Sequence, residues 1–322
     1  MKKNANLLNS HPALSVAINL ILLVIISGSC SKERSGITKD EYSSTSDFHN
    51  KNEVVSQHYS VDAASGGSFT TPKGTKVVIP ASAFINTSGD IVSGNIDIEF
   101  KDIYKKSEML LSDVPSTTYG RPLKSAGEFF IRATTGSNFL EIAPGKKIEI
   151  DQPFNDIPAD TLMMPFAGIL DSADINWNAT DSIPFANVTP TLSSYVFSLY
   201  QFSFPLSAGT WCNSDNSTYF QNYPLTTLTL TPTDDVNVFG TDVFLVFKNV
   251  NCMIHVYRDN IDKFPYNYAP KGLECTLVAL GVKDGKIYSA FVPVTIADNQ
   301  TVSFTLTETT TDDFKAQLAE LD

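Results

Sequence analysis

The sequence has little positive charge. It holds 23 Lys and Arg against 35 Asp and Glu among 322 residues, which gives a formal net charge of −12. Nucleic-acid binding depends on clustered Lys and Arg side chains that neutralise phosphates. The composition therefore excludes a nucleic-acid partner, and it is typical of an exposed, acidic protein body.

Long apolar runs are scarce as well. The uncharged apolar segment from Ala13 to Ile26 is shorter than the ~20 residues that a membrane-spanning helix needs. It follows Lys2 and Lys3 and ends in small residues, which is the order of a secretory signal peptide. We therefore expect the chain to be exported.

The four residues SGSC, which end at Cys30, follow this segment. They resemble the lipobox of bacterial lipoproteins in its relaxed, Bacteroidota-type form, where a peptidase cuts before the cysteine and the thiol carries a lipid. The resemblance implies a signal peptide over residues 1–29, lipid attachment at Cys30 and an outer-membrane lipoprotein. The next three residues, SKE, resemble a signal for the cell surface. The alternative is an ordinary secretory signal with Cys30 as a leftover thiol.

Cysteine is rare, with four in the chain: Cys30, Cys212, Cys252 and Cys275. Without Cys30 the number is odd, in a compartment where disulfides form. Cys252 and Cys275 both begin strand-like runs, so one expectation is a disulfide between them. Three buried, inert thiols are the alternative.

Helical periodicity is nearly absent. Short β-branched and aromatic runs recur between Gly, Pro, Asn and Asp, and this texture predicts an all-β protein with two β-sandwich domains. Residues 30–65 are polar and rich in Ser, so we expect a lipidated cysteine followed by a disordered tether. The segment from Thr311 to Leu321 predicts a short C-terminal amphipathic helix with Thr311 as its cap.

Residues 66–153 have the texture of a first domain. Gly66 and Gly67 precede a Pro-Lys-Gly turn, the apolar strand VVI, a small residue with Phe84, and a hairpin that contains glycine. This order resembles the ZU-five domain, the β-sandwich module of ankyrins and netrin receptors. The resemblance implies a ZU-five-like sandwich over residues 66–153.

Residues 154–224 are broken by prolines and predict a connecting region, partly irregular and partly strand, packed on the first sandwich. Three triplets resemble the Asp-Ser/Thr-aliphatic acceptor of O-glycosylation in Bacteroidota-type exported proteins, so Thr161, Ser172 and Ser182 are candidate sites. Beyond this region, six strand-like runs predict an immunoglobulin-like sandwich over residues 225–322, which includes the C-terminal helix.

Side chains for catalysis are few. Of the four histidines, His49 and His58 lie in the expected tether and predict no metal site, while His255 alternates with its neighbours in a strand. A nucleophile needs a base nearby, and a strand histidine is more often an ordinary sheet residue. We therefore do not expect a Cys212–His255 dyad.

Two further motifs are incomplete. Some relatives of the ZU-five domain cleave themselves at His-Phe-Ser, but Gln201 stands in the place of that histidine, so we expect no cleavage at Ser203. Asn213, Asp215 and Ser217 have the spacing of a calcium loop without its glycine and glutamate. The sequence thus predicts no metal and no cofactor.

Together these features predict a lipid-anchored cell-envelope protein that is not an enzyme but a binding or structural module, with a surface protein or a glycan as its partner. One alternative is a glycan hydrolase whose carboxylates come together only in the fold, since Asp234-Asp235 and Asp312-Asp313 predict a turn and a helix start. Another is an assembly subunit that lends an edge strand to a neighbour. The aromatic candidates for stacking on sugar rings are Trp177, Trp211, Tyr219, Phe220 and Tyr223.

Overall fold

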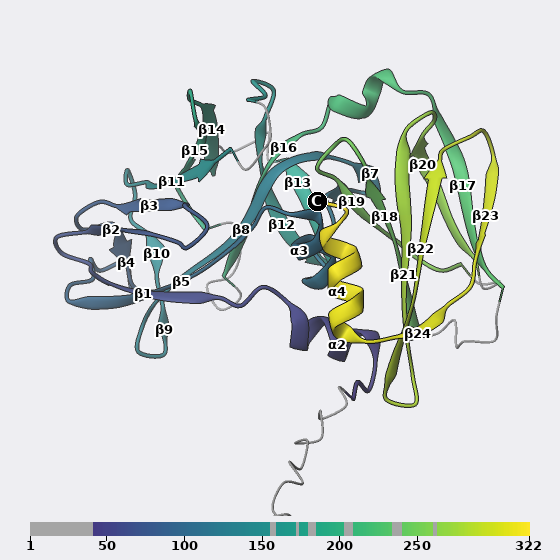
Figure 1. Ribbon diagram of the computed structural model, residues 1–322. Coiled ribbons are helices and arrows are strands. Elements are labelled where there is room, and N and C mark those ends of the chain that lie inside the picture. Colours follow the sequence, from purple (N-terminus) through teal and green to yellow (C-terminus); the bar gives the residue numbers. More distant parts are fainter. Residues whose placement is uncertain are drawn as a thin grey trace, which may run out of the picture. The chain divides into compact units, whose positions relative to one another are not determined.

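Two β-sandwiches make up the part of the chain that the structure describes (Figure 1). The computed structural model describes residues 41–154, 159–171, 174–179, 185–202, 209–233, 240–259 and 263–322. Strands dominate these residues and the helices among them are short, so the predicted all-β class is confirmed. None of the helices in these ranges has the length and apolar character needed to cross a membrane.

The first sandwich packs a seven-stranded sheet against a five-stranded sheet. Its strands are β1 (Gln57–Asp62), β2 (Gly67–Thr70), β3 (Lys76–Ile79), β5 (Asn95–Ile103), β8 (Lys124–Thr135), β9 (Asn138–Phe139), β11 (Ile148–Pro153), β12 (Met164–Asp171), β13 (Asp174–Ala179), β14 (Ala186–Pro190), β15 (Ser194–Leu199) and β16 (Thr210–Asn216). The larger sheet has the order β1-β5-β8-β16-β12-β13, with β9 paired to β8, and the smaller one has the order β14-β15-β11-β3-β2.

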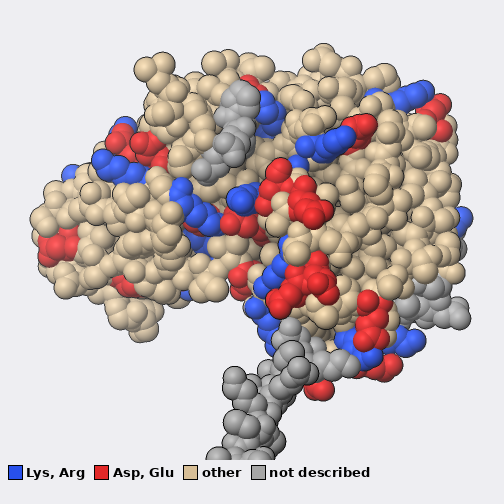
Figure 2. Space-filling view, viewed as in Figure 1, with Lys and Arg blue, Asp and Glu red and all other residues tan. Residues whose placement is uncertain are grey.

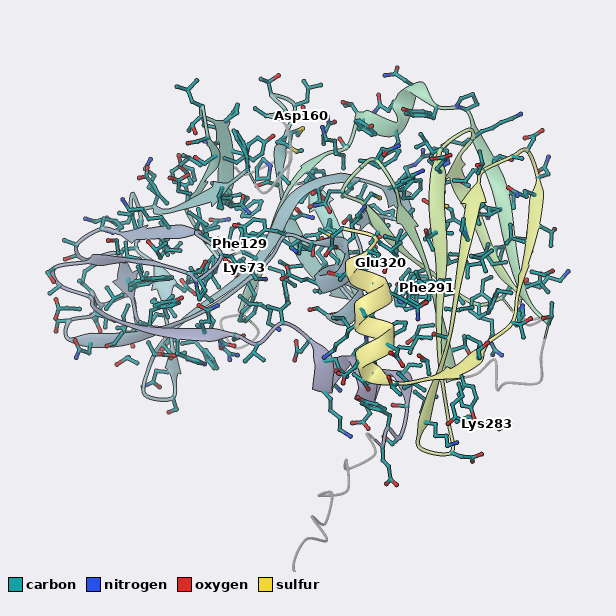
Figure 3. The ribbon with its side chains drawn as sticks, in the orientation of Figure 1. Lys73, Phe129, Asp160, Lys283, Phe291 and Glu320 are labelled. Carbon is teal, nitrogen blue, oxygen red and sulfur yellow. The ribbon has the colours of Figure 1, made fainter. Side chains whose placement is uncertain are left out.

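Alternating side chains build the core of this sandwich. Ile96, Ile98 and Phe100 point from β5 to the same side, as the period of a strand requires. Phe129 of β8 joins them and contacts Phe197 of the opposite sheet, with ring centroids 4.9 Å apart (Figure 3). Two small two-stranded sheets complete the described strands of this part: β4 (Phe84–Ile85) with β10 (Glu141–Ile142), and β6 (Thr117–Thr118) with β7 (Arg121–Pro122).

The first sandwich is larger than residues 66–153. It begins with β1, upstream of that range, and β12 to β16 come from residues 154–224. The prolines do not prevent this, because Pro190 ends β14, an edge strand, where a missing N–H is tolerated. The predicted end of the first sandwich at residue 153 is therefore wrong, because the strands of residues 154–224 are members of its sheets. The resemblance to a ZU-five domain stays a prediction.

The predicted disordered tether over residues 30–65 is wrong from residue 41 onward. Thr45–Asn52 form the helix α2, whose first turn is capped by the Ser44 side chain, which accepts a hydrogen bond from the Asp47 N–H. Phe48 of α2 is fully buried, and β1 pairs with β5. The segment is polar overall, but its buried side chains, Phe48 with Thr45 and His49, dock the short helix on an existing core.

The second sandwich packs three strands against five. Its strands are β17 (Leu225–Pro232), β18 (Thr241–Phe247), β19 (Met253–Val256), β20 (Phe264–Pro270), β21 (Glu274–Lys283), β22 (Lys286–Thr295), β23 (Gln300–Phe304) and β24 (Thr307–Thr309). The sheets have the orders β20-β17-β23 and β19-β18-β21-β22-β24, and β17 runs parallel to β23. An immunoglobulin-like relationship stays a prediction.

The C-terminal helix is confirmed as α4 (Thr311–Ala319), although its cap is Thr310 and not Thr311. The Thr310 hydroxyl accepts a hydrogen bond from the Asp313 N–H at 3.1 Å. Phe314 of α4 packs on Phe291 of β22, with centroids 5.6 Å apart (Figure 3). The amphipathic face predicted from the sequence thus covers the second sandwich.

A third apolar core joins the two sandwiches. Trp177 of β13 and Phe244 of β18 belong to it, together with Phe48 of α2 and Phe314 of α4, whose rings lie 5.5 Å apart. The short helix α3 (Lys106–Leu111) contributes to the same core, and Figure 1 shows α2, α3 and α4 between the two sets of strands. The sandwiches are therefore held together by buried apolar surface.

Cys212, Cys252 and Cys275 are buried, free thiols. The disulfide expected between Cys252 and Cys275 is absent, and the alternative of three buried thiols is the one observed. Burial raises the pKa of the Cys275 thiol to about 12, and it also raises the pKa values of Cys212 and Cys252. Such thiols are protonated at neutral pH and are poor nucleophiles.

Candidate functional site

A recess of 520 Å³ is formed by α2, the turn after α3, and strands β13, β16, β18, β19 and β20. This volume is within the range of small-molecule binding sites in proteins. Two histidines, two aspartates and two aromatic side chains give the lining its chemistry: His49, His255, Asp113, Asp242, Trp211 and Tyr257. The sequence separates these residues by up to two hundred positions, so the fold alone brings them together.

His255 lies between two carboxylates. Its Nδ1 atom is 3.0 Å from Asp113 Oδ1, and its Nε2 atom is 3.8 Å from Asp242 Oδ1. Strand pairing explains the placement, because His255 of β19 lies opposite Phe244 of β18, and Asp242 is two residues before Phe244 on the same side of that strand.

His49 reaches the same carboxylate from the helix. The ring contacts the Leu111 carbonyl through Nδ1 at 3.2 Å, so Nδ1 carries the proton and donates it. The Nε2 atom lies 3.3 Å from Asp242 Oδ2 but makes no aligned hydrogen bond with it. His49 shares a buried helix face with Thr45 and Phe48, which is the spacing of an amphipathic helix.

Asp242 stays ionised because it has two histidine partners. Burial acts to raise the pKa of this carboxyl group, but the contact with His49 and the charge of His255 outweigh burial and hold the pKa below its ordinary value. Asp242 therefore presents ionised oxygens to the recess, held by contacts with two imidazole rings.

A second group of carboxylates lies outside the recess, at a β-bulge between β8 and β16. Glu128 and Asp215 are completely buried, and the Asn213 amide donates to both, at 3.4 Å and 2.7 Å. Gly127 allows the bulge, since its φ is +128° and a Cβ atom there would lie 2.3 Å from the ring of Tyr104.

Burial raises the pKa values of both Glu128 and Asp215 well above their ordinary values, and Asp215 adds to the effect on Glu128 by charge repulsion. One oxygen of each carboxyl group, Glu128 Oε2 and Asp215 Oδ1, has no hydrogen-bond partner. Neither side chain lines the recess. These two carboxyl groups thus have the raised pKa values of catalytic acids but no access to a substrate.

Asn213 and Asp215, whose spacing resembles that of a calcium loop, belong to the buried cluster around Glu128. Asn213 and Asp215 are buried and hydrogen-bonded to each other, as described above. Within the residues that the structure describes, no group of three or more His, Cys, Asp or Glu side chains is placed to hold a metal ion.

The aromatic side chains considered for sugar stacking, and the two residues considered for a dyad, lie in different environments. Trp177 and Phe220 are buried and unavailable to a ligand, whereas Trp211 lines the recess. Tyr219 and Tyr223 are half-buried and lie outside the recess lining. Cys212 belongs to the core of the first sandwich, away from the recess that holds His255, so the two do not form a dyad.

Other predicted positions fall partly outside the described residues. Thr161 is exposed, in the turn before β12, and is accessible to modification. Cys30, Ser172, Ser182, Ser203 and Asp234-Asp235 lie outside the described ranges. Asp312 and Asp313 open α4, as the sequence predicts.

The sequence reasoning missed most of the recess. His49 was assigned to the tether, and Asp113, Asp242 and Tyr257 belong to no motif. One usable signal was the burial pattern of α2, since Thr45, Phe48 and His49 have helical spacing.

Neither a protein-family model nor a curated protein matches the chain. The geometry of the recess is therefore the basis for a functional proposal.

Proposed function

We propose that the chain is a lipid-anchored protein of the bacterial outer membrane, and that its folded part is a non-enzymatic binding module. The observation that carries the binding role is the 520 Å³ recess, where Asp242 is ionised and partnered by His49 and His255. Such an arrangement fixes polar groups in position for a ligand without providing an acid of raised pKa.

The carboxyl groups argue against the hydrolase alternative. A glycosidase needs one protonated carboxyl group and one ionised carboxylate that face each other across an open cleft. In this chain the carboxyl groups with raised pKa values, Glu128 and Asp215, are buried, and the recess carboxylate Asp242 has a lowered pKa. The two carboxyl groups with raised pKa values therefore lack the access that a catalytic acid needs.

The proposed lipid anchor limits the distance between the recess and the membrane. Ten residues lie between Cys30 and Glu41, where the described fold begins, and a fully extended chain over this stretch spans about 40 Å at most. The helix α2, which follows at once, supplies one wall of the recess. A lipid on Cys30 would therefore hold the binding site close to the membrane surface.

Mass spectrometry of the mature N-terminus tests the anchor. We expect a first residue Cys30 that bears acyl groups, and membrane association that is lost in Cys30→Ser but kept in the neighbouring control Ser31→Ala. A mature chain with an unmodified Cys30, or one that still begins at Met1, would contradict the proposal.

A further inference from the structure

Tyr257 gives the recess an aromatic surface, and other rings pack against it. Its ring stacks on the His255 imidazole, with centroids 4.6 Å apart and 28° between the planes. His255 in turn contacts the buried ring of Phe244 at 4.6 Å. Tyr257 is nevertheless 51% exposed, so it offers a rigid, accessible ring at little cost in conformational entropy.

The other large aromatic side chains of the lining are Phe264, which is buried, and Trp211, which packs against its neighbours. Lys101 Nζ lies 5.7 Å from its ring centroid, and the ring of Phe130 lies 5.4 Å away. We assign the stacking role to Tyr257 and not to Trp211, because the Tyr257 side chain is 51% exposed whereas Trp211 is half-buried.

The polar groups beside Tyr257 are oriented in advance. The side chains of Asp113 and Asp242 are 24% and 21% exposed, so they remain accessible while His255 fixes their positions. Carboxylate oxygens accept hydrogen bonds in more than one direction, which leaves sites for hydroxyl donors. A ligand that combines an apolar face with several hydroxyl groups matches both parts of this surface.

Charge selects among ligands of that kind. The chain carries a formal net charge of −12, and the recess lining holds three carboxylates, from Glu53, Asp113 and Asp242, beside the guanidinium group of Arg258. An anionic ligand would be repelled. A cation would gain little, because Glu53 is paired with Lys101 and the aspartates face histidines. On the face that Figure 2 shows, acidic and basic side chains likewise lie in small mixed groups.

We propose that the recess binds a short neutral saccharide, with one sugar ring stacked on Tyr257 and its hydroxyl groups donating hydrogen bonds to Asp113 and Asp242. The inference rests on the proposed binding function and names its ligand class. The 520 Å³ volume limits the bound portion to a few sugar units at most.

The test is isothermal titration calorimetry of the full chain in detergent with cellotetraose, chitotetraose and mannotetraose, and with tetragalacturonate as the acidic comparison. We expect at least one neutral tetrasaccharide to bind and the acidic one not to bind. Tyr257→Ala should weaken the affinity about tenfold or more, which corresponds to the loss of one stacking contact. Tyr119→Ala removes a 70% exposed tyrosine outside the recess and should leave the affinity unchanged.

A second variant protects the test against misfolding. Asp242→Asn keeps the shape of the side chain and should also weaken binding, while circular dichroism of all variants reports on the fold. Equal affinity of the wild type, Tyr257→Ala and Asp242→Asn would overturn the recess site but leave a binding module with a site elsewhere. Binding of none of the neutral tetrasaccharides would overturn the saccharide class itself. The acyl groups on Cys30, measured on the same material, report separately on the anchor.

Discussion

The carboxyl groups of the recess and those of the β-bulge differ in the direction in which their pKa values shift. Asp242 in the recess has a lowered pKa because two histidines approach it. Asp215 at the β-bulge has a raised pKa because it is buried and its hydrogen-bond partners are uncharged amide and hydroxyl groups. The partner of a carboxyl group, and not burial by itself, thus decides the direction of the shift. The first cluster is suited to contact a ligand, and the second is a structural feature of the sheet.

The largest expected effect on stability comes from a substitution that undocks α2 from the core and should disturb the recess but not the β-bulge. Phe48→Ala removes the buried ring that docks α2, and it should lower the free energy of unfolding by about 3–5 kcal/mol. Hydrogen exchange should show lost protection in α2 and the recess, with protection kept at the bulge between β8 and β16. Val55→Ala, at a 78% exposed position, is the control and should have little effect.

Equal loss of protection at the bulge in Phe48→Ala would mean that the two clusters form one cooperative unit. The comparison between them would then fail, since α2 would support both.

The next effect concerns the bulge. The pKa of Glu128 is higher in the folded state than in the unfolded state. The stabilisation that comes from its protonation is therefore complete below the ordinary pKa of 4.5, and it is lost as the pH rises through the pKa of the folded state. Glu128→Gln removes this loss, so it should raise the free energy of unfolding at pH 8 by about 1–3 kcal/mol. Urea denaturation at pH 5 and pH 8 measures the difference.

The matched control for this change is Glu141→Gln, in the exposed position of β10. It should change the stability by less than about 0.5 kcal/mol at either pH. Destabilisation by Glu128→Gln at pH 8 would show that the Glu128 carboxylate has an unrecognised positive partner.

The smallest effect concerns the recess. Since the folded-state pKa of Asp242 is lowered, its stabilisation is present above the ordinary pKa of 3.8 and is lost as the pH falls through the folded value. Asp242→Asn should therefore cost about 1–2 kcal/mol at pH 7 and should reduce the loss of stability in acid. Denaturation curves between pH 3 and pH 7 give both quantities.

An exposed histidine–aspartate pair provides the control. His58 Nδ1 lies 2.7 Å from Asp97 Oδ2 between β1 and β5, and both side chains are about half exposed. Asp97→Asn should cost less than about 0.5 kcal/mol, because solvent screens the pair. Equal costs for Asp242→Asn and Asp97→Asn would mean that the recess carboxylate is not specially stabilised.

The sequence predicts the class of the fold and its regular elements. Alternation such as that of Ile96, Ile98 and Phe100 depends on the strand period and survives in the structure, and the terminal helix has its own cap and apolar face. Residues 154–224 misled the prediction because a proline such as Pro190, at the end of an edge strand, looks like a break when the neighbouring strand is unknown.

The site could not be predicted, for a physical reason. His49 becomes part of the recess because Phe48 docks on a core whose other members include Phe314, far along the chain. A short polar helix of this kind owes its order to tertiary packing and not to local propensity. Likewise, His255 has its significance from Asp113 and Asp242, which no local motif links to it.

The most direct test of the account is an imidazole nuclear magnetic resonance spectrum of the full chain, recorded while the tightest-binding neutral tetrasaccharide is added. With four histidines in the sequence, the ring signals are few enough to assign by substitution. The account predicts that the signals of His255 and His49 shift in proportion to occupancy while that of His58, on the exposed strand β1, stays in place. Unchanged recess signals under saturating saccharide would contradict it.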